Sequence, residues 1–169
     1  MRLTGLFVAL VGLLTACAPA PSSRIGPDGL PLPQVYRISA ADEADIQFRM
    51  LDGINSLRQA AGVSPVQLNS QLTAAAKTHS RDMAVQNRPW HFGSDGSSPI
   101  DRVRRVGYFG TLLGENISET YETELQTLAA WMELQGTRNV ILDPSARNVG
   151  LGWFQEEAGK IWWTLTVGT

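Results

Sequence analysis

Two histidines and a set of carboxylates are the side chains of this chain that could carry acid–base or metal chemistry. The histidines are His79 and His91, in a sequence of 169 residues. His79 lies next to Ser80, but neighbours in sequence do not face one another on a helix. Its four-residue spacing from Met83 places it on an apolar stripe, which predicts a core histidine with a hydrogen-bond partner. His91, in a segment rich in Gly, Ser and Asp, is therefore the histidine left for chemistry.

Hydrolysis would need a nucleophile that His91 could activate. No Gly-x-Ser-x-Gly turn follows a predicted strand, and the Ser, His and Asp residues give no recognisable triad. A hydrolase would then have to use His91 as its base and a serine or a water molecule as the attacking group. These residues therefore do not predict a hydrolase with a serine triad.

Cys17 is the only cysteine, and it follows a segment typical of export. Arg2 gives a positive start, and residues 3–14 form an uncharged apolar run that is shorter than the roughly 20 residues needed to span a bilayer. Leu14-Thr15-Ala16-Cys17 then resembles the bacterial lipobox, in which the cysteine is lipidated after cleavage. We predict a lipoprotein signal peptide over residues 1–16 and a membrane anchor through a lipid on Cys17.

The segment after Cys17 has the composition of a tether. Prolines and glycines recur up to residue 33 and interrupt any regular element, so we predict a tether over residues 17–40 and a folded domain over residues 41–169. In the bacterial lipoproteins that this segment resembles, Asp directly after the cysteine favours the inner membrane. The resemblance therefore implies that Ala18 directs the protein to the outer membrane, with the domain facing the periplasm. Loss of Arg2 with the signal peptide changes the net charge from −2 to −3, and this acidic balance argues against nucleic acid as a partner.

Hydrophobic periodicity predicts helices first and strands last in the domain. The expected helices cover residues 42–61, 70–87, 99–107 and 120–134, with Gly136 ending the fourth; that helix turns Leu125, Leu128, Ala129 and Met132 inward. A short strand is expected at residues 115–120. Alternating residues at 148–155 and 161–167, joined by a turn at 156–160, predict a β-hairpin. The fold class is therefore α+β, with helices packed on a small antiparallel sheet.

Several motifs recur in the order seen in one family. They are Leu68 to Leu72 followed by Ala74 to Met83; Trp90-His91-Phe92 with Ser98-Pro99; Asp101-Arg102 with Gly107-Tyr108; Gly114-Glu115-Asn116-Ile117; Trp131-Met132; and Ile141-Leu142 with Asn148 to Gly152. In this order the chain resembles the CAP superfamily of cysteine-rich secretory and pathogenesis-related proteins, over roughly residues 46–168. The resemblance implies an α-β-α sandwich around a central cavity.

In that family, two histidines and one or two glutamates line the cavity and can hold a divalent metal. The resemblance places His91 and Glu115 at the first histidine and first glutamate. Thr137 stands where bacterial members have the second histidine, and Glu133 falls one residue before the place of the further glutamate, a rotation of about 100° on a helix. Zinc needs three or four ligands, so His91 and Glu115 alone make a zinc site doubtful. An imidazole–carboxylate pair is the simpler expectation.

The arginine cluster and the tryptophans each allow more than one interpretation. Arg102, Arg104 and Arg105 are expected to point mostly into solvent, with an anionic partner or cell-wall component as the alternative. Most tryptophans are expected in the core, and Trp90 is the best candidate for an exposed contact.

The predicted function is an envelope-anchored domain that binds a small ligand, lipid, peptide or wall component in a groove lined by His91, Glu115, Glu133 and Thr137. One alternative is a peptidase-like hydrolase, metal-assisted or not, that acts on envelope substrates. A structural domain with a vestigial cavity is the other alternative.

Overall fold

The computed structural model describes Leu30 and residues 36–169. The predicted signal peptide, Cys17 and most of the tether lie outside the described residues. Residues 36–169 contain η1 (Ala40–Asp42), α1 (Glu43–Ala60), β1 (Gln67–Leu68), α2 (Ser70–Gln86), α3 (Pro99–Arg105), β2 (Leu112–Ser118), α4 (Glu124–Glu133), α5 (Gln135–Ile141), β3 (Asn148–Gln155) and β4 (Ile161–Gly168). Within this part of the chain, no helix has both the length and the apolar character needed to cross a membrane.

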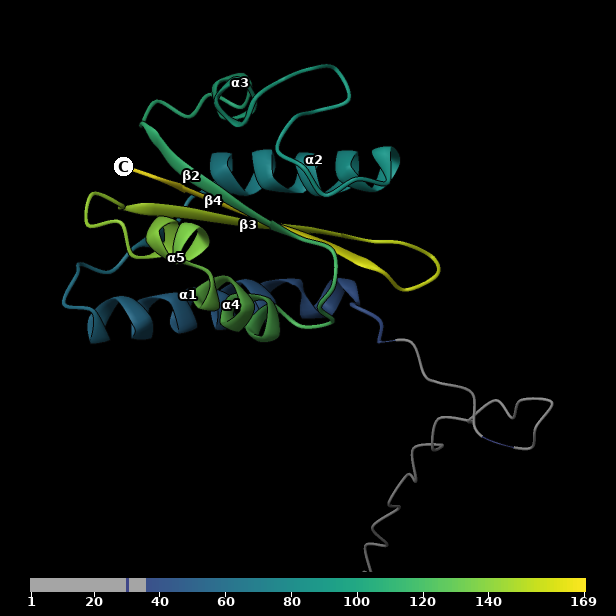
Figure 1. The fold of residues 1–169 in the computed structure, drawn as a ribbon, viewed down its shortest axis with the longest axis horizontal. Helices are drawn as coiled ribbons and strands as arrows, with labels where there is room; N and C mark the ends of the chain where they lie inside the picture. Colours follow the sequence, from purple (N-terminus) through teal and green to yellow (C-terminus); the bar gives the residue numbers. More distant parts are fainter. Residues whose placement is uncertain (1–29, 31–35) are drawn as a thin grey trace, which may run out of the picture. The chain divides into compact units, whose positions relative to one another are not determined.

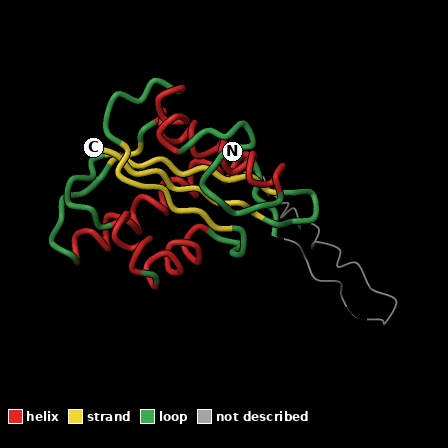
Figure 2. The backbone as a smooth tube through the Cα atoms, turned by 45° about the horizontal axis from the view of Figure 1, so that its top comes forward, coloured by secondary structure: helices red, strands yellow, loops and turns green. Residues whose placement is uncertain are grey.

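The domain is a sandwich in which helices cover both faces of one four-stranded sheet. The strand order is β1-β3-β4-β2. Helices α2 and α3 lie on one face, and α1, α4 and α5 lie on the other (Figure 1, Figure 2). This confirms the α+β class and the predicted hairpin of β3 and β4. The sheet is mixed rather than antiparallel, because β1 pairs in parallel with β3 through Gln67 and Leu68.

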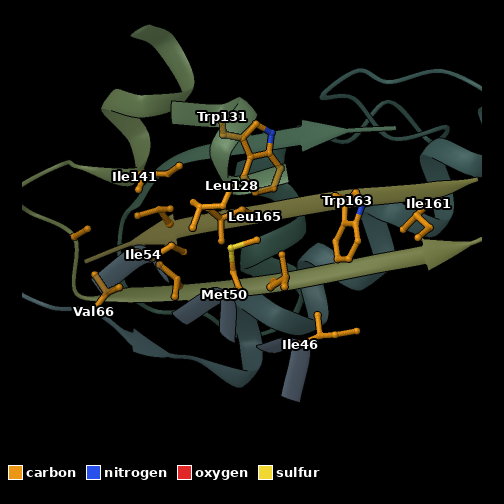
Figure 3. Close-up of a cluster of buried hydrophobic side chains, with 14 residues drawn as sticks. Ile46, Met50, Ile54, Val66, Leu128, Trp131, Ile141, Ile161, Trp163 and Leu165 are labelled. Carbon is orange, nitrogen blue, oxygen red and sulfur yellow. The ribbon is translucent and has the colours of Figure 1, made fainter. Parts of the chain in front are cut away.

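The larger core fills the space between the sheet and helices α1, α4 and α5. Figure 3 shows Trp131, Leu128 and Ile141 facing Met50, Ile54 and Trp163 across this layer. A smaller cluster of Leu72, Ala75, Val103 and Tyr108 lies under α2 and α3. Every residue of β4 is buried, because the strand is central and both of its faces are covered. The prediction that most tryptophans serve the core is confirmed for Trp131, Trp162 and Trp163.

Helix α2 lies directly on β3, and this contact depends on two glycines. A Cβ built on Gly150 would come within 2.2 Å of the α2 backbone at Leu72 and Thr73, and one built on Gly152 would come equally close at Lys77. Asn69 starts α2 by accepting a hydrogen bond from the Leu72 amide at 3.0 Å. The close packing at the two glycines holds α2 against the sheet and so positions the loop that follows the helix.

The fourth predicted helix differs most from the structure. It begins after Thr123, whose side chain caps the Gln126 amide, rather than at Thr120. It ends at Glu133 because Leu134 is extended, and the chain then re-enters a helix, α5, that includes Gly136. The buried face of α4 consists of Glu124, Thr127, Leu128 and Trp131, so the expectation that Leu125 and Ala129 point inward was wrong.

Candidate functional site

The loop over residues 88–98 carries His91 and joins α2 to α3. Helix α2 ends at Gln86, and the next residue, Asn87, caps it in the left-handed conformation at φ 48°. Ser98 then starts α3 through a capping box with Asp101, and Pro99 stands at the first helical position. Between these ends, Asp82 of α2 accepts hydrogen bonds from the amide and the hydroxyl of Ser94. The loop is therefore tied to both helices that flank it.

Glu115, on the edge strand β2, lies beneath this loop and binds two of its neighbours. Its side chain is only 2% exposed. Nδ1 of His91 lies 3.0 Å from Oε1, and Nη2 of Arg102 lies 2.9 and 2.8 Å from the two carboxylate oxygens. A carboxylate can only accept, so both neighbours donate. The structure thus brings the predicted pair His91 and Glu115 together, with Arg102 as a third member.

The sequence-based expectation that Arg102 points into solvent is wrong. Arg102 is 5% exposed, whereas Arg104 and Arg105 are exposed as expected. Besides Glu115, the Arg102 guanidinium donates through Nη1 to the carbonyls of His91 and Ser97, at 3.0 and 3.1 Å. The buried carboxylate and two loop carbonyls supply the partners that a buried cation requires. Arg105 instead forms an exposed ion pair with Asp95.

His79 is the core histidine that the sequence predicts, and it also borders the site. It is fully buried, and its Nε2 lies 2.9 Å from the carbonyl oxygen of Trp90. The same nitrogen lies 3.7 Å from Oε1 of Glu115. Burial lowers the pKa of His79, and the nearby charge of Glu115 opposes that shift only in part. His79 is therefore neutral at neutral pH and contributes a hydrogen bond rather than a charge.

Thr137 and Glu133 contact other parts of the molecule. Asn116 follows Glu115 on β2, so the two side chains point to opposite faces of the sheet. Asn116 donates to the carbonyl of Thr137 at 2.9 Å, and the Thr137 hydroxyl donates to the carbonyls of Trp131 and Leu134. Glu133 is exposed and lines a separate hollow with Tyr121 and Gln126. Neither residue has a polar contact with His91 or Glu115 within the described residues.

The residues present do not fit the divalent metal that the family resemblance implies. Both oxygens of Glu115 already bind the Arg102 guanidinium, and a divalent ion there would meet that positive charge at close range. The Thr137 hydroxyl is a donor to carbonyls, not a metal ligand. Across residue 30 and residues 36–169, no three His, Cys, Asp or Glu side chains are placed to share a metal ion. The positive charge next to the Glu115 carboxylate is therefore supplied by Arg102 rather than by a metal ion.

A cavity of about 250 Å³ lies next to the cluster, between α2, the loop and α3. Ala75, Thr78 and Val106 contribute to its wall, and Arg102 connects it to Glu115 and His91. Its size is below the range of about 300–1,000 Å³ typical of sites for drug-sized ligands, so it suits a smaller group. His91 and Glu115 do not line this cavity, which differs from the predicted groove.

The aromatic residues beside His91 form a small partly exposed surface. Trp90 is partly buried, and its indole donates to Gln86 at 2.7 Å. The guanidinium of Arg88 stacks 3.8 Å from the Trp90 ring, and the Phe92 ring lies 5.6 Å away in a tilted arrangement. Phe92 is 48% exposed. The sequence indicated Trp90 as a surface contact, but the contributions of Arg88 and Phe92 depend on the loop conformation.

The arrangement supports ligand contact more readily than catalysis. The side chain of His91 is 49% exposed, and Glu115 is the one polar partner of its ring within the described residues. No serine, threonine or cysteine is hydrogen-bonded to that ring in this part of the chain, so the nucleophile–base contact of a covalent hydrolase is missing there. What the site offers is an oriented imidazole at the surface, next to aromatic side chains and a small cavity.

Comparisons with known proteins agree with the fold and the motif order. The model of the cysteine-rich secretory protein family, CAP, matches residues 51–167. YkwD of Bacillus subtilis (strain 168) is 31% identical over 120 residues, which cover 71% of this chain and 46% of YkwD, so the match spans about half of that relative.

Two solved structures share the fold at low sequence identity. An outer surface protein of Borrelia burgdorferi has a TM-score of 0.69 at 14% identity, and the match covers 80% of this chain and 98% of that one. An extracellular protein of Bacillus anthracis with an SCP domain has a TM-score of 0.68 at 22% identity, with 88% and 45% covered. With the family model matching more than half of its length, the chain belongs to the CAP, or cysteine-rich secretory protein, family.

Proposed function

We propose that this protein is an envelope-anchored CAP-domain lipoprotein that binds a ligand at the surface formed by His91, its aromatic neighbours and the adjacent cavity. The observation that carries this proposal is the difference in solvent exposure between His91 and the two residues that hold it. Glu115 and Arg102 are sealed from solvent, whereas His91 is half-exposed and held by both of them, through its ring and its carbonyl. A ligand would therefore meet His91 directly. Glu115 would act on the ligand only through His91, whereas Arg102 also borders the adjacent cavity.

Two observations support a binding role outside the cytoplasm. The lipobox-like sequence ending at Cys17 follows an apolar segment of signal-peptide length. The two similar proteins described above are named as an outer surface protein and as an extracellular protein. We propose that the lipid on Cys17 holds the domain at the outer membrane and that the Pro-rich segment after it acts as a spacer. A peptide, a lipid or a component of the cell wall is then the accessible class of ligand.

The experiment is a calorimetric titration of a soluble form that begins at Ala18, with soluble peptidoglycan fragments as the first probe. Vesicles of phosphatidylglycerol and phosphatidylethanolamine are the second probe. We expect saturable binding of one probe, weakened about tenfold or more in His91→Ala, as for a central contact residue. Thr78→Phe, at an exposed position of α2 that lines the cavity, is expected to weaken it as well.

Phe109→Ala is the matched control, because Phe109 is an exposed loop residue that lines none of the cavity beside the cluster. It is expected to bind like the unaltered chain. Equal binding in His91→Ala and Phe109→Ala would contradict the proposal and would favour a structural domain whose cavity is vestigial. Absence of binding by either probe would contradict it too.

The hydrogen-bonded pair of His91 and Glu115 is the one observation that favours hydrolysis as a second function. A carboxylate behind an exposed imidazole is the arrangement that orients a general base. Incubation of the same fragments with the protein, followed by mass spectrometry, tests this. Cleavage that disappears in both His91→Ala and Glu115→Gln would establish the hydrolase. Unchanged fragments would leave the binding role.

A further inference from the structure

Two buried side chains hold two consecutive carbonyl groups of the loop. His79 of α2 lies 2.9 Å through Nε2 from the carbonyl oxygen of Trp90. Arg102 of α3 lies 3.0 Å through Nη1 from the carbonyl oxygen of His91. Both donors are buried, at 0% and 5% exposure. The peptide backbone on either side of the His91 Cα is therefore fixed by elements that enter from two different helices.

The ring of His91 is held from a third element. Its Nδ1 donates to Glu115 of β2 at 3.0 Å, and the Arg102 guanidinium holds that carboxylate through both oxygens. Arg102 thus acts on one exposed residue twice, directly at its carbonyl and indirectly at its ring. This leaves little freedom for the rotamer of His91, since the backbone and the ring partner are both fixed.

Burying these polar and charged groups costs free energy. A buried ion pair must overcome the desolvation of both charges, and the cluster is not fully satisfied: Nδ1 of His79 and Nε of Arg102 have no hydrogen-bond partner within the described residues. Besides the part of the cavity wall that Arg102 forms, these buried groups act at the surface through the orientation of the His91 ring. Supporting side chains of this kind can hold a surface group in the geometry that binding requires.

The contacts also determine where the ring protons are. A carbonyl oxygen can only accept, so Nε2 of neutral His79 carries the proton. A carboxylate can only accept, so Nδ1 of neutral His91 carries the proton, and its Nε2 keeps a lone pair. The two histidines of the chain are therefore opposite tautomers, fixed by different acceptors.

We propose that Arg102 and His79 are positioning residues that hold His91 as the Nδ1-protonated tautomer, with Nε2 presented to solvent as a hydrogen-bond acceptor. Resting on the proposed binding function, this assigns the ligand a chemical feature: it donates an N–H or O–H group to His91. Amide N–H groups of peptides and hydroxyl groups of saccharides have this chemistry, whereas a bare anion does not.

The test is a long-range 1H–15N correlation spectrum of the histidine rings, recorded on the soluble form that begins at Ala18, without ligand, above the pH at which histidine titrates. We expect His91 as the Nδ1–H form and His79 as the Nε2–H form. Assignment comes from His79→Gln and His91→Gln. A His91 ring that is Nε2-protonated, or that averages between the two forms, would overturn the proposal in the unaltered protein, whether or not any variant folds.

Arg102→Lys and Arg104→Lys form the matched pair, because both change an arginine of α3 and only Arg102 touches the loop. We expect Arg102→Lys to convert His91 into a mixture of tautomers and Arg104→Lys to leave it unchanged. Identical spectra for the two variants would overturn the positioning role of Arg102. A purely structural role would alter stability without moving the tautomer.

The acceptor role has its own readout, which is separate from binding. On addition of peptidoglycan fragments, the Nε2 resonance of His91 should move toward the frequencies of a hydrogen-bonded imine nitrogen. If fragments bind in calorimetry while this resonance stays still, the acceptor role fails and the binding function stands. If the tautomers are as expected and neither fragments nor vesicles bind, the binding function fails and the positioning by Arg102 stands.

Discussion

Arg102 and Arg104 are two residues apart on α3, yet they occupy opposite environments. We expect Arg102→Ala to lower the free energy of unfolding by about 3–5 kcal/mol, because it leaves the buried Glu115 carboxylate without its cation. Arg104→Ala, at an exposed position, should change it by no more than about 0.5 kcal/mol. Urea denaturation followed by tryptophan fluorescence measures both. Equal midpoints for the two variants would show that the buried pair contributes no stability.

His79 gives the protein a predicted dependence of stability on pH. Burial lowers the pKa of His79 below its usual value near 6.5, so the folded state keeps it neutral while the unfolded chain takes up a proton. Stability is then fully present above about pH 6.5 and falls as the pH decreases from there toward the folded-state pKa, by at most about 1.4 kcal/mol per pH unit.

His79→Gln is the control for this pH effect, because the glutamine amide can still donate to the Trp90 carbonyl and does not titrate. Denaturation midpoints of both proteins between pH 7.5 and 5.5 should diverge, with a steeper loss in the unaltered chain. Parallel curves would show that another group causes the acid sensitivity.

Zinc should not bind tightly to the unaltered domain. The Arg102 guanidinium occupies both oxygens of Glu115, and Thr137 replaces the histidine that would complete the family's ligand set. Calorimetric titration with zinc at neutral pH should therefore show no saturable heat at micromolar protein. Micromolar binding that disappears in His91→Ala would mean that a third ligand had replaced Arg102, and the interpretation of Arg102 as the cation of the site would be wrong.

The site illustrates which residue roles sequence patterns can indicate. The motif order singled out His91 and Glu115 together, and the apolar spacing identified His79 as a core residue. Arg102 could not be identified in this way, because an arginine in a basic cluster on a short helix is normally exposed to solvent. Its burial follows from the position of Glu115 on β2, which lies under the loop only once α2 and α3 are packed on the sheet.

At the scale of elements, the contact between α2 and β3 determines the position of the loop that carries His91. We predict that Gly150→Ala lowers the free energy of unfolding by about 3 kcal/mol or more, because its Cβ would overlap the α2 backbone at 2.2 Å and neither element can move alone. Gly136→Ala is the control: a Cβ there meets nothing within 4 Å and the backbone is not left-handed, so alanine should stabilise by about 0.4–1 kcal/mol because it restricts the unfolded chain. Thermal denaturation distinguishes the two, and a mild effect at Gly150 would show that α2 can shift.

The elements themselves differ in how far the sequence predicts them. Helices α1 and α2 and the β3–β4 hairpin have strong periodicity with clear caps or turns, and their bounds are close to those expected. The sequence predicts the end of α4 near Leu134 but not the helix α5 that follows it, because Gly136 is typical of a helix stop and instead lies in the first turn of α5. Only the extended backbone of Leu134 separates the two helices. The parallel pairing of β1 is equally hidden, because a two-residue strand has no periodicity and its partner lies about 80 residues later in the chain.

At the scale of the whole molecule, the domain is stabilised by packing without covalent cross-links. Both core clusters draw their buried residues from positions between Ile46 and Val167, and the single cysteine of the chain lies outside the described residues. Helices on both faces of the sheet shield the central strand β4 completely, which is how a sheet of four strands can bury so much apolar surface. The residues that form the two core clusters are therefore separate from the cysteine that we propose as the lipid anchor.

This separation leads to a prediction about location. Cys17→Ser removes the thiol that would carry the lipid, so the exported chain should no longer be labelled by radioactive palmitate and should leave the membrane fraction. Its denaturation midpoint should match that of the soluble form that begins at Ala18, because no residue of either core cluster lies near Cys17 in sequence. Membrane retention of Cys17→Ser would instead mean that the domain surface or the uncleaved apolar segment holds the protein there. Treatment with high salt would then distinguish these two, because it releases a surface contact and leaves an inserted segment in place.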